Sequence, residues 1–507
     1  MEIDGSAAAP ASLDIHPTLD EVRELAGNYN LIPVYHSFIS DLETPVSAFL
    51  KLGARKNSYL LESAEQGERI GRYSFLGCDP RAIVTFEDGE LKIREGDDET
   101  VSGCDDPFDA ISEYMSRYTA PEFEELPPFI GGAVGLFGYD LVRWAEELPP
   151  AKTDTLGLPD MAFMVSDSTV IFDHLKHKIF VLANVMVEAG EDISASYETA
   201  CDRVRKLKEL LSRPLPQPVR HKRGPLGEPV SNFKREDFES AVEQVKEYIF
   251  AGDCFQAVPS QRFQVDVDVS PFGIYRGLRT VNPSPYMYYI AFEDFSLVGS
   301  SPEPLIKVDR GWVETRPIAG TRPRGATPEE DKKLAEDLLA DEKERAEHIM
   351  LVDLGRNDLG RVCVPGTVEV VDLMRIEYYS HVMHIVSVVV GKLRDDMKAT
   401  DALKAAFPAG TVSGAPKIRS MEIINELEPV KRCSYAGAIG YLSFQCGELD
   451  TCICIRTIVV KDNTAYVQVG GGVVADSIPA LEYEETRNKA HALFAAIELA
   501  QAQEEWE

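Results

Sequence analysis

Residues 327–354, TPEEDKKLAEDLLADEKERAEHIMLVDL, contain the clearest helix signal of the chain. Thr327 is a good N-cap, Pro328 fits the first turn, and the acids that follow suit the positive end of the helix dipole. Strand-like segments bounded by Gly, Pro and Asp surround this helix, and helices and strands arrive in unequal blocks. That order favours an α+β layered fold over a regular parallel βαβ sheet.

Two more helices have recognisable starts. One begins near 413–416 (SGAP) and carries KIRSMEIINEL, and the other begins near 476–479 (DSIP) and runs through ALEYEETRNKAHALFAAIELA. One stretch is typical of a linker, because 213–231 (RPLPQPVRHKRGPLGEPVS) holds five prolines. We therefore predict an N-terminal region at 15–212, a linker at 213–231 and a second region at 232–503.

Composition excludes several classes of protein. The 507 residues include 52 Lys+Arg against 84 Asp+Glu, a formal charge of −32, and no basic stripe suited to nucleic acid or an anionic membrane. No apolar run is long enough for a transmembrane helix, and no secretory signal is present at the start. Nine scattered cysteines do not suggest a disulfide framework. We expect a cytoplasmic protein without nucleic-acid or membrane partners.

Acidic pairs on two predicted helices are candidate metal ligands. Glu344 and Glu347 lie three residues apart, as do Glu482 and Glu485, so each pair shares a helix face. Carboxylates are the ligands that Mg²⁺ prefers. The simpler interpretation is a solvated acidic face, which spacing alone cannot exclude.

Other polar signals have two interpretations each. The glycines of 470–477 (GGGVVADS) could approach a ligand or form a tight turn. His381 and His384 lie in an apolar run and are core or catalytic residues. Arg456, inside CICIRTIVV, must pair with an internal carboxylate or with an anionic ligand. Cys452 and Cys454 are better explained as packed thiols than as metal ligands.

Seven segments, taken together, resemble the chorismate-utilising enzyme family, and within it the anthranilate synthases. They are SPEPL (301–305), PIAGTRPRG (317–325), AEHIMLVDLGRNDLGRV (346–362), HVMHIVSVVVG (381–391), FPAGTVSGAPKIRSME (407–422), LDTCICIRT (449–457) and EETRNKA (484–490). The resemblance implies a layered fold of two large, mostly antiparallel β-sheets packed face to face with helices outside. It also implies conversion of chorismate and ammonia to anthranilate and pyruvate.

The resemblance also assigns roles to residues. Glu347 and Glu485 match the family's Mg²⁺ ligands, with Glu344 and Glu482 in support. His384 matches the catalytic histidine, whereas His381 has no such role, and Glu303 is a candidate general acid. The matching substrate-binding positions are Gly320, Thr411, Tyr435, Arg456, Gly470, Gly471, Gly472 and Lys489.

Two positions separate the sister enzymes of the family. Aminodeoxychorismate synthase component I, the alternative activity, often has a nucleophilic Lys where this chain has Ala319. Isochorismate and salicylate synthases have a Lys that activates water at the catalytic position of Gln256. Neither alanine nor glutamine can do that chemistry.

The N-terminal half resembles the region with which anthranilate synthases bind tryptophan as a feedback inhibitor. The resemblance rests on LLESAEQGERIGRYSFLG (60–77) and NPSPYMYY (282–289). The inhibitor-binding positions that match are Glu62, Ser63, Asn282, Pro285, Tyr286 and Met287. The chain has no segment suited to a glutaminase, so a separate glutamine amidotransferase subunit is expected to supply the ammonia.

Overall fold

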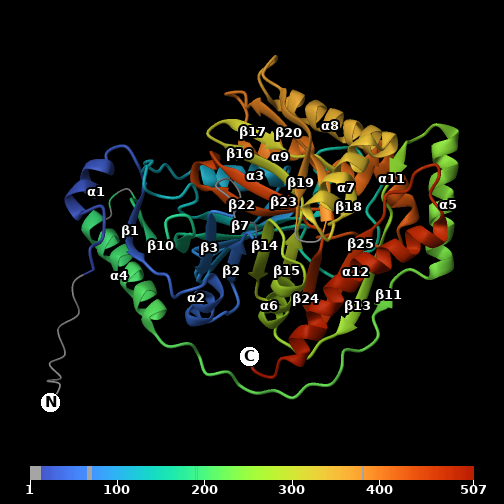
Figure 1. The fold of residues 1–507 in the computed structure, drawn as a ribbon. Helices are drawn as coiled ribbons and strands as arrows, with labels where there is room; N and C mark the ends of the chain where they lie inside the picture. Colours follow the sequence, from blue (N-terminus) through green and yellow to red (C-terminus); the bar gives the residue numbers. More distant parts are fainter. Residues whose placement is uncertain (1–12, 65–70, 189, 191, 380–381, 507) are drawn as a thin grey trace.

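Two large antiparallel sheets form the centre of the protein (Figure 1). The computed structural model describes residues 13–64, 71–188, 190, 192–379 and 382–506. Within these ranges one sheet has 11 strands and the other has 12. The first is ordered β1 (Leu31–Ile39), β10 (Lys178–Met186), β9 (Ser168–Asp173), β3 (Tyr73–Cys78), β2 (Ser58–Glu62), β14 (Tyr286–Ala291), β15 (Phe295–Ser301), β24 (Thr457–Lys461), β25 (Thr464–Gly470), β13 (Ser260–Asp266), β11 (Val230–Ser231).

The second sheet contains the remaining long strands. Its order is β18 (Ile318–Pro323), β20 (Val382–Lys392), β17 (Trp312–Thr315), β16 (Pro304–Asp309), β23 (Leu449–Ile453), β22 (Ala438–Ser443), β7 (Gly132–Phe137), β8 (Met161–Ser166), β4 (Ala82–Glu87), β5 (Glu90–Glu95), β6 (Asp98–Gly103), with β19 (Glu369–Tyr378) also paired to β20. A two-stranded ladder joins β12 (Gln256–Ala257) to β21 (Gly414–Ala415).

The sheets pack face to face, and helices cover their outer surfaces. A buried cluster between the sheets joins Tyr59, Phe75 and Tyr288 of the first to Leu136 and Ile439 of the second. A second cluster packs the first sheet against α2 (Pro45–Leu52), α4 (Ile193–Ser212), α6 (Pro271–Val281) and α12 (Pro479–Ala502). A third packs the second sheet against α3 (Pro107–Ser116), α8 (Glu342–Val362) and α9 (Ala399–Ala406). The predicted α+β layered fold is confirmed.

Strands from both halves of the sequence share both sheets. In the first sheet, β2 pairs with β14 in a register that places Glu62 opposite Met287. In the second, β7 pairs with β22, with Ala438 opposite Phe137. The segment 213–229, which joins the two halves of the sequence, contains no helix or strand. The division into regions 15–212 and 232–503 stays a prediction about the sequence.

One predicted helix is two helices in the structure. The segment 327–354 forms α7 (Pro328–Ala340) and the start of α8, with a break at Asp341. The Asp341 carboxylate accepts hydrogen bonds from the backbone of Lys343 and Glu344, so it caps a new helix. The other two helix predictions are confirmed by α11 (Lys417–Leu427) and α12.

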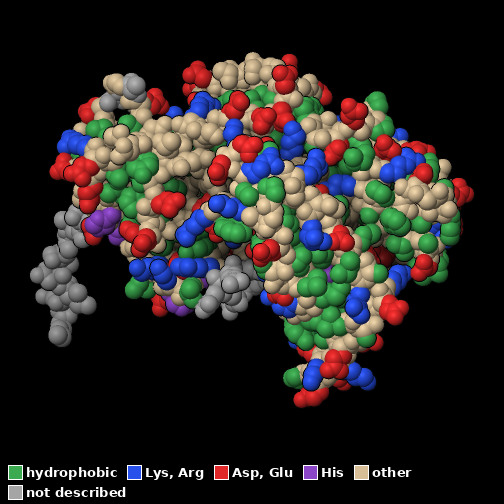
Figure 2. Space-filling model, turned by 90° about the horizontal axis from the view of Figure 1, so that it is seen from above, with side chains coloured by type: hydrophobic (Ala, Val, Ile, Leu, Met, Phe, Trp, Pro, Cys, Tyr) green, Lys and Arg blue, Asp and Glu red, His purple; other side chains and the backbone are tan. Residues whose placement is uncertain are grey.

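Cys452 and Cys454 are packed thiols, as predicted. All nine cysteines are free, and Cys452 and Cys454 are buried. Among the residues that the structure describes, no helix is long and apolar enough to cross a membrane. On the face in Figure 2, acidic and basic side chains are interspersed with apolar ones.

Candidate functional site

A glycine segment, Gly470–Gly472, lies at the centre of the predicted catalytic site. It begins at the last residue of β25 and is held by the backbone hydrogen bond from Gly471 to the carbonyl of Pro259, 3.2 Å long. A Cβ at Gly470 would lie 2.7 Å from the Tyr435 hydroxyl, and one at Gly472 would lie 2.7 Å from Nε2 of Gln256. Close approach by these two side chains therefore requires glycine at both positions.

The four predicted metal-ligand glutamates form two pairs, Glu344 and Glu347 on α8 and Glu482 and Glu485 on α12, and the second pair lies against this segment. An ideal Cβ on Gly471 would be 3.2 Å from Glu482 Oε2 and 3.9 Å from Glu485 Oε1. On α8, Glu347 Oε1 accepts a hydrogen bond of 3.1 Å from Gln256, the residue that also contacts Gly472. The segment thus connects the carboxylates of α8 and α12.

The charge of each pair is only partly neutralised. Burial raises the pKa of Glu344, and the charge of Glu347 raises it further. Burial and the charge of Glu485 likewise raise the pKa of Glu482. Two cations oppose this repulsion: Arg322 lies 3.5 Å from Glu344, and Lys489 lies 2.7 Å from Glu485. The Lys489 ammonium also donates to the carbonyl of Gly470, at 2.9 Å.

These glutamates are a donor set that fits a hard divalent cation. Within the described ranges, no group of three or more His, Cys, Asp or Glu side chains is close enough to hold a metal ion. However, the oxygens of Glu482 and Glu485 converge on space that a Cβ at Gly471 would fill. Repulsion within each pair is also what a bound cation relieves.

Glu303, between β15 and β16, is the carboxylate with the most perturbed proton affinity in the site. Burial raises its pKa to about 7, while a hydrogen bond from the Thr411 hydroxyl, 2.9 Å long, acts in the opposite direction. A carboxyl group with this pKa is partly protonated near neutral pH. It can therefore donate a proton there.

His384, on β20, is held as a neutral imidazole. Its Nδ1 lies 2.9 Å from the carbonyl of Gly320 and 3.1 Å from the Thr321 hydroxyl. Because a carbonyl only accepts, Nδ1 carries the proton and Nε2 keeps its lone pair. Burial lowers the pKa of His384, and the charge of Arg456 lowers it further. Gly320 needs its flexibility, since its φ is +68° and Glu344 approaches closely.

Arg456 is a cation without a bonded partner. Burial lowers its pKa, and the nearest groups that oppose the shift are Tyr435 and Glu485. Within the described part of the chain, its guanidinium makes no hydrogen bond and no ion pair. Of the two interpretations open from the sequence, the structure therefore favours an anionic ligand over an internal carboxylate.

The predicted inhibitor site lies elsewhere, in a cleft of about 1740 Å³ between the sheets. Glu62, Ser63, Pro285, Tyr286 and Met287 line this cleft. Glu62 accepts a 2.5 Å hydrogen bond from Tyr275 and lies 3.3 Å from Arg279. The Tyr286 hydroxyl donates to Asp450, 2.9 Å away.

Asn282 differs from the other five predicted inhibitor residues. It is the C-cap of α6, and its amide donates to the hydroxyl of Ser300 at 3.4 Å rather than lining the cleft. His381 and part of the 60–77 motif lie outside the described residues.

Several residues that pack behind the predicted site residues were not predicted from the sequence. Tyr379 stacks edge-on against His384, with ring centroids 5.4 Å apart. Arg432 and Glu428 form a buried ion pair of 2.6 Å. The adjacent charges in EPVKRC were a weak signal, because such a run is usually solvated.

Comparison with known proteins gives one consistent result. Residues 56–495 match the family described as chorismate binding enzyme. "Anthranilate synthase component 1" of Acetivibrio thermocellus is 50% identical over 494 residues, covering 96% of this chain and 99% of that protein. The same-named protein of Pseudomonas aeruginosa is 50% identical over 491 residues, covering 95% and 98%.

Solved structures agree with the sequence matches. Anthranilate synthase component I from Streptococcus pneumoniae superposes with a TM-score of 0.75 at 42% identity, covering 90% of this chain and 98% of that one. The isochorismate synthase MenF of Escherichia coli shares the fold, with a TM-score of 0.69 at 17% identity over 94% of this chain and 98% of that one. The chain belongs to the chorismate-binding enzyme family and, within it, to the anthranilate synthase component 1 group.

Proposed function

We propose that this chain is the chorismate-converting subunit of an anthranilate synthase, which forms anthranilate and pyruvate from chorismate and ammonia in tryptophan biosynthesis. Relatives with that name support the activity. The single structural observation that carries the proposal is the unpartnered guanidinium of Arg456 beside His384 and Glu485. In an otherwise acidic site, a cation of this kind suits an anionic substrate.

Chorismate has two carboxylates, and the site offers a place for each. Arg456 binds the enolpyruvyl carboxylate through two parallel hydrogen bonds. Glu347 and Glu485, with Glu344 and Glu482 in support, would hold Mg²⁺, which would supply positive charge for the ring carboxylate. Substrate contacts also come from Gly320, Thr411, Tyr435, Lys489 and the amides of Gly470, Gly471 and Gly472.

The first chemical step exchanges a hydroxyl for an amine. The ammonia nitrogen forms a bond to ring C2, the double bonds shift, and the C4–oxygen bond breaks; the attached nitrogen then loses one proton, which leaves a neutral amine and returns Glu303 to its acid form. Glu303 gives its proton to the departing hydroxyl, which leaves as water. Its pKa of about 7 keeps that proton available near neutral pH. Thr411 orients the carboxyl group through the 2.9 Å hydrogen bond.

The second step aromatises the ring. His384 Nε2 takes the proton from C2, and the C3–oxygen bond breaks to release enolpyruvate, which takes up a proton to become pyruvate. The bond from Nδ1 to the carbonyl of Gly320 fixes the tautomer with Nε2 unprotonated. Burial keeps this imidazole neutral and therefore competent as a base.

The positions that separate the sister enzymes support this reaction over the alternatives. Ala319 lies on β18 opposite Ile385 and offers no nucleophile for the aminodeoxychorismate synthase reaction. Gln256 donates to Glu347 and has no basic atom with which to activate water. Ammonia is therefore the nucleophile that the site accommodates.

We propose that ammonia production and inhibition by tryptophan take place outside the catalytic site. A glutamine amidotransferase subunit supplies ammonia, consistent with relatives named component 1. Tryptophan binds in the cleft between the sheets at Glu62, Ser63, Pro285, Tyr286 and Met287, with Asn282 behind it.

The deciding experiment is a product assay with the purified chain, chorismate, Mg²⁺ and ammonium, with and without tryptophan. We expect fluorescent anthranilate and equimolar pyruvate, with turnover suppressed by tryptophan, and none from the His384→Ala variant. A product with nitrogen at C4 would instead identify aminodeoxychorismate synthase. Tryptophan binding without any chorismate consumption, even with the amidotransferase added, would identify a regulatory subunit.

A further inference from the structure

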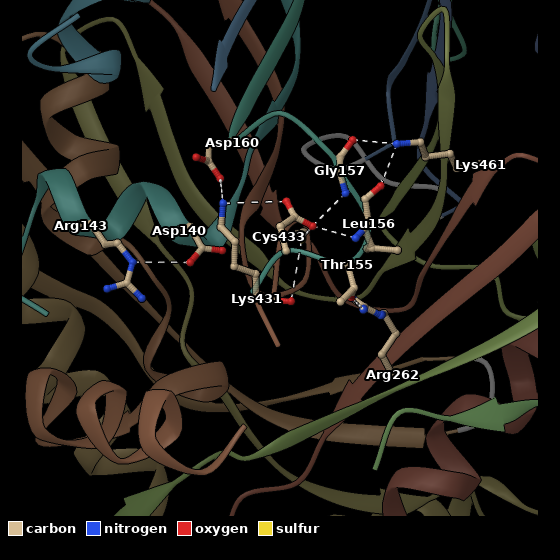
Figure 3. Close-up of polar contacts among 11 residues, drawn as sticks. Asp140, Arg143, Thr155, Leu156, Gly157, Asp160, Arg262, Lys431, Cys433 and Lys461 are labelled. Carbon is tan, nitrogen blue, oxygen red and sulfur yellow. Dashed lines mark hydrogen bonds and ion pairs between the residues drawn. The ribbon is translucent and has the colours of Figure 1, made fainter. Parts of the chain in front are cut away.

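Two consecutive cations, the half-buried Lys431 and the buried Arg432, follow α11 and point to different parts of the protein. Lys431 Nζ lies 3.0 Å from Asp160 and 4.0 Å from Asp154, on the loop that precedes β8 (Figure 3). Arg432 is 2% exposed and turns the other way, toward segments that carry predicted site residues.

The Arg432 guanidinium binds two separate backbone segments. Its Nη1 donates to the carbonyl of Val412 at 2.7 Å, and its Nη2 donates to the carbonyl of Val258 at 2.6 Å. Val412 follows Thr411, the partner of Glu303, and Val258 lies two residues after Gln256, the partner of Glu347. One side chain thus sets the distance between two segments that each carry a predicted site residue.

The counter-ion, Glu428, extends the same network to the glycine segment. Arg432 Nε donates to Glu428 Oε2 at 2.9 Å, and Glu428 Oε1 accepts from the backbone and the hydroxyl of Ser260, at 2.8 and 2.7 Å. Ser260 is paired with Gly470 across β13 and β25. The ion pair therefore also positions the start of Gly470–Gly472.

The flat face of the guanidinium supports Tyr435. The Arg432 carbon lies 5.3 Å from the centroid of the Tyr435 ring and 4.9 Å from that of Tyr139. A planar cation can stack on rings while its edge makes hydrogen bonds in fixed directions, whereas a lysine ammonium cannot.

We propose that Arg432, with Glu428, is a positioning residue for the reaction: it holds Thr411, Gln256, Tyr435 and Gly470 in register without touching substrate. The inference rests on the proposed function for its kinetic readout. It differs from a general stabilising role because every hydrogen bond of the guanidinium ends on Glu428 or on a segment that carries the site.

The test is Arg432→Lys, compared with Lys431→Met as the matched control. Arg432→Lys keeps the buried charge but cannot bond both carbonyls and Glu428 together. We expect kcat/KM for chorismate to fall about 30-fold or more. If Glu303 is the general acid, kcat falls as pH rises through its pKa of about 7; this limb of the pH profile should also move to higher pH, because displacement of Thr411 removes the bond that lowers that pKa. Lys431→Met should lower the thermal midpoint and leave kcat, KM and the limb unchanged.

Glu428→Gln provides a second variant if Arg432→Lys does not fold. It keeps an acceptor oxygen of the same size, and we expect an intermediate loss of kcat/KM with the same direction of limb shift. Wild-type kinetics and an unshifted limb in a folded variant would overturn the proposal, since Arg432 would then act on stability alone.

A crystal structure of Arg432→Lys tests the inference without any activity measurement. Displacement of Thr411, Gln256 or Tyr435 supports it, and unchanged positions overturn it. If the wild-type chain makes no anthranilate, the proposed function fails while this structural readout still decides the positioning role.

Discussion

Glu303 and Glu62 lie in the two candidate ligand sites, and their surroundings differ. Glu62, in the cleft between the sheets, has the Tyr275 hydroxyl and the Arg279 guanidinium as partners. Glu303 has one hydroxyl, from Thr411, and a pKa raised to about 7. The arginines differ in the same way, because Arg279 is paired and Arg456 is not. Among the described residues Glu303 and Arg456 make no ion pair, which fits the site proposed for the chemistry, whereas Glu62 and Arg279 of the cleft are paired with each other.

The largest expected effect comes from Arg456→Met. Loss of a charged partner to a buried carboxylate costs several kcal/mol, so we expect kcat/KM for chorismate to fall about 1000-fold. Folding stability should be unchanged or higher, because an unpaired buried charge is removed. Steady-state kinetics and thermal unfolding measure both. Arg279→Met, which removes a paired arginine, is the control and should leave kcat/KM within about twofold. Equal losses of kcat/KM in Arg456→Met and Arg279→Met would contradict the proposed difference between the two sites.

Glu303→Gln ranks second. Removal of a general acid typically lowers kcat about 100-fold or more, and the pH limb near 7 should vanish from the profile. Wild-type kcat and an unchanged pH profile in Glu303→Gln would show that another residue is the general acid.

The same variant predicts a pH-dependent gain in stability. The folded-state pKa of Glu303 is raised to about 7, above an unfolded value of about 4.3. Its stabilising contribution is therefore complete below about pH 4.3 and lost as pH rises through about 7. Relative to wild type, Glu303→Gln should gain in thermal midpoint between pH 5 and pH 8. A constant difference over that range would contradict the assigned pKa.

Removal of Mg²⁺ should have a smaller effect on binding. Without the cation, four glutamates repel the ring carboxylate, and we expect chorismate affinity to weaken about 10- to 50-fold. Calorimetric titration with and without a chelator measures it. Because burial and neighbouring charge raise the pKa of Glu344 and Glu482, cation binding should also release protons. Glu347→Gln should abolish the response to Mg²⁺.

Ser63→Ala is the mildest variant and acts on the other site. Loss of one hydroxyl contact should raise the tryptophan inhibition constant about 10-fold while uninhibited kcat/KM stays within about twofold. Inhibition assays at fixed chorismate decide this. Unchanged inhibition would remove Ser63 from the regulatory site.

The sequence predicted more of the secondary structure than of the tertiary arrangement. The segments SGAP and DSIP marked the starts of α11 and α12, because first-turn signals are local, although neither helix has a side-chain cap. The break at Asp341 was not predicted, because the sequence alone does not show whether an Asp within a helical pattern continues that helix or caps a new one. The spacing gave the pairs Glu344/Glu347 and Glu482/Glu485, but only the pairing of β13 with β25 brings Gln256, Gly470–Gly472 and α12 together.

The specific roles in the site came from resemblance, and burial explains why pattern alone was insufficient. Arg456 had two interpretations until the structure gave its surroundings. Arg432 had only a weak signal, because a run such as KRC is typical of a polar turn, and only the structure shows its bonds to Val412, Val258 and Glu428. Whether a charge is compensated depends on residues far apart in sequence.

The order of the strands has a consequence for synthesis on the ribosome. β24 and β25 lie between β15 and β13, and β22 and β23 lie between β16 and β7. The N-terminal strands emerge first, but the second sheet is complete only after β23 has been translated to Ile453, and the first only after β25 has been translated to Gly470. Such long-range pairing is slow and leaves strand edges exposed in the meantime. A nascent chain of this protein is therefore a natural client for chaperones over most of its translation.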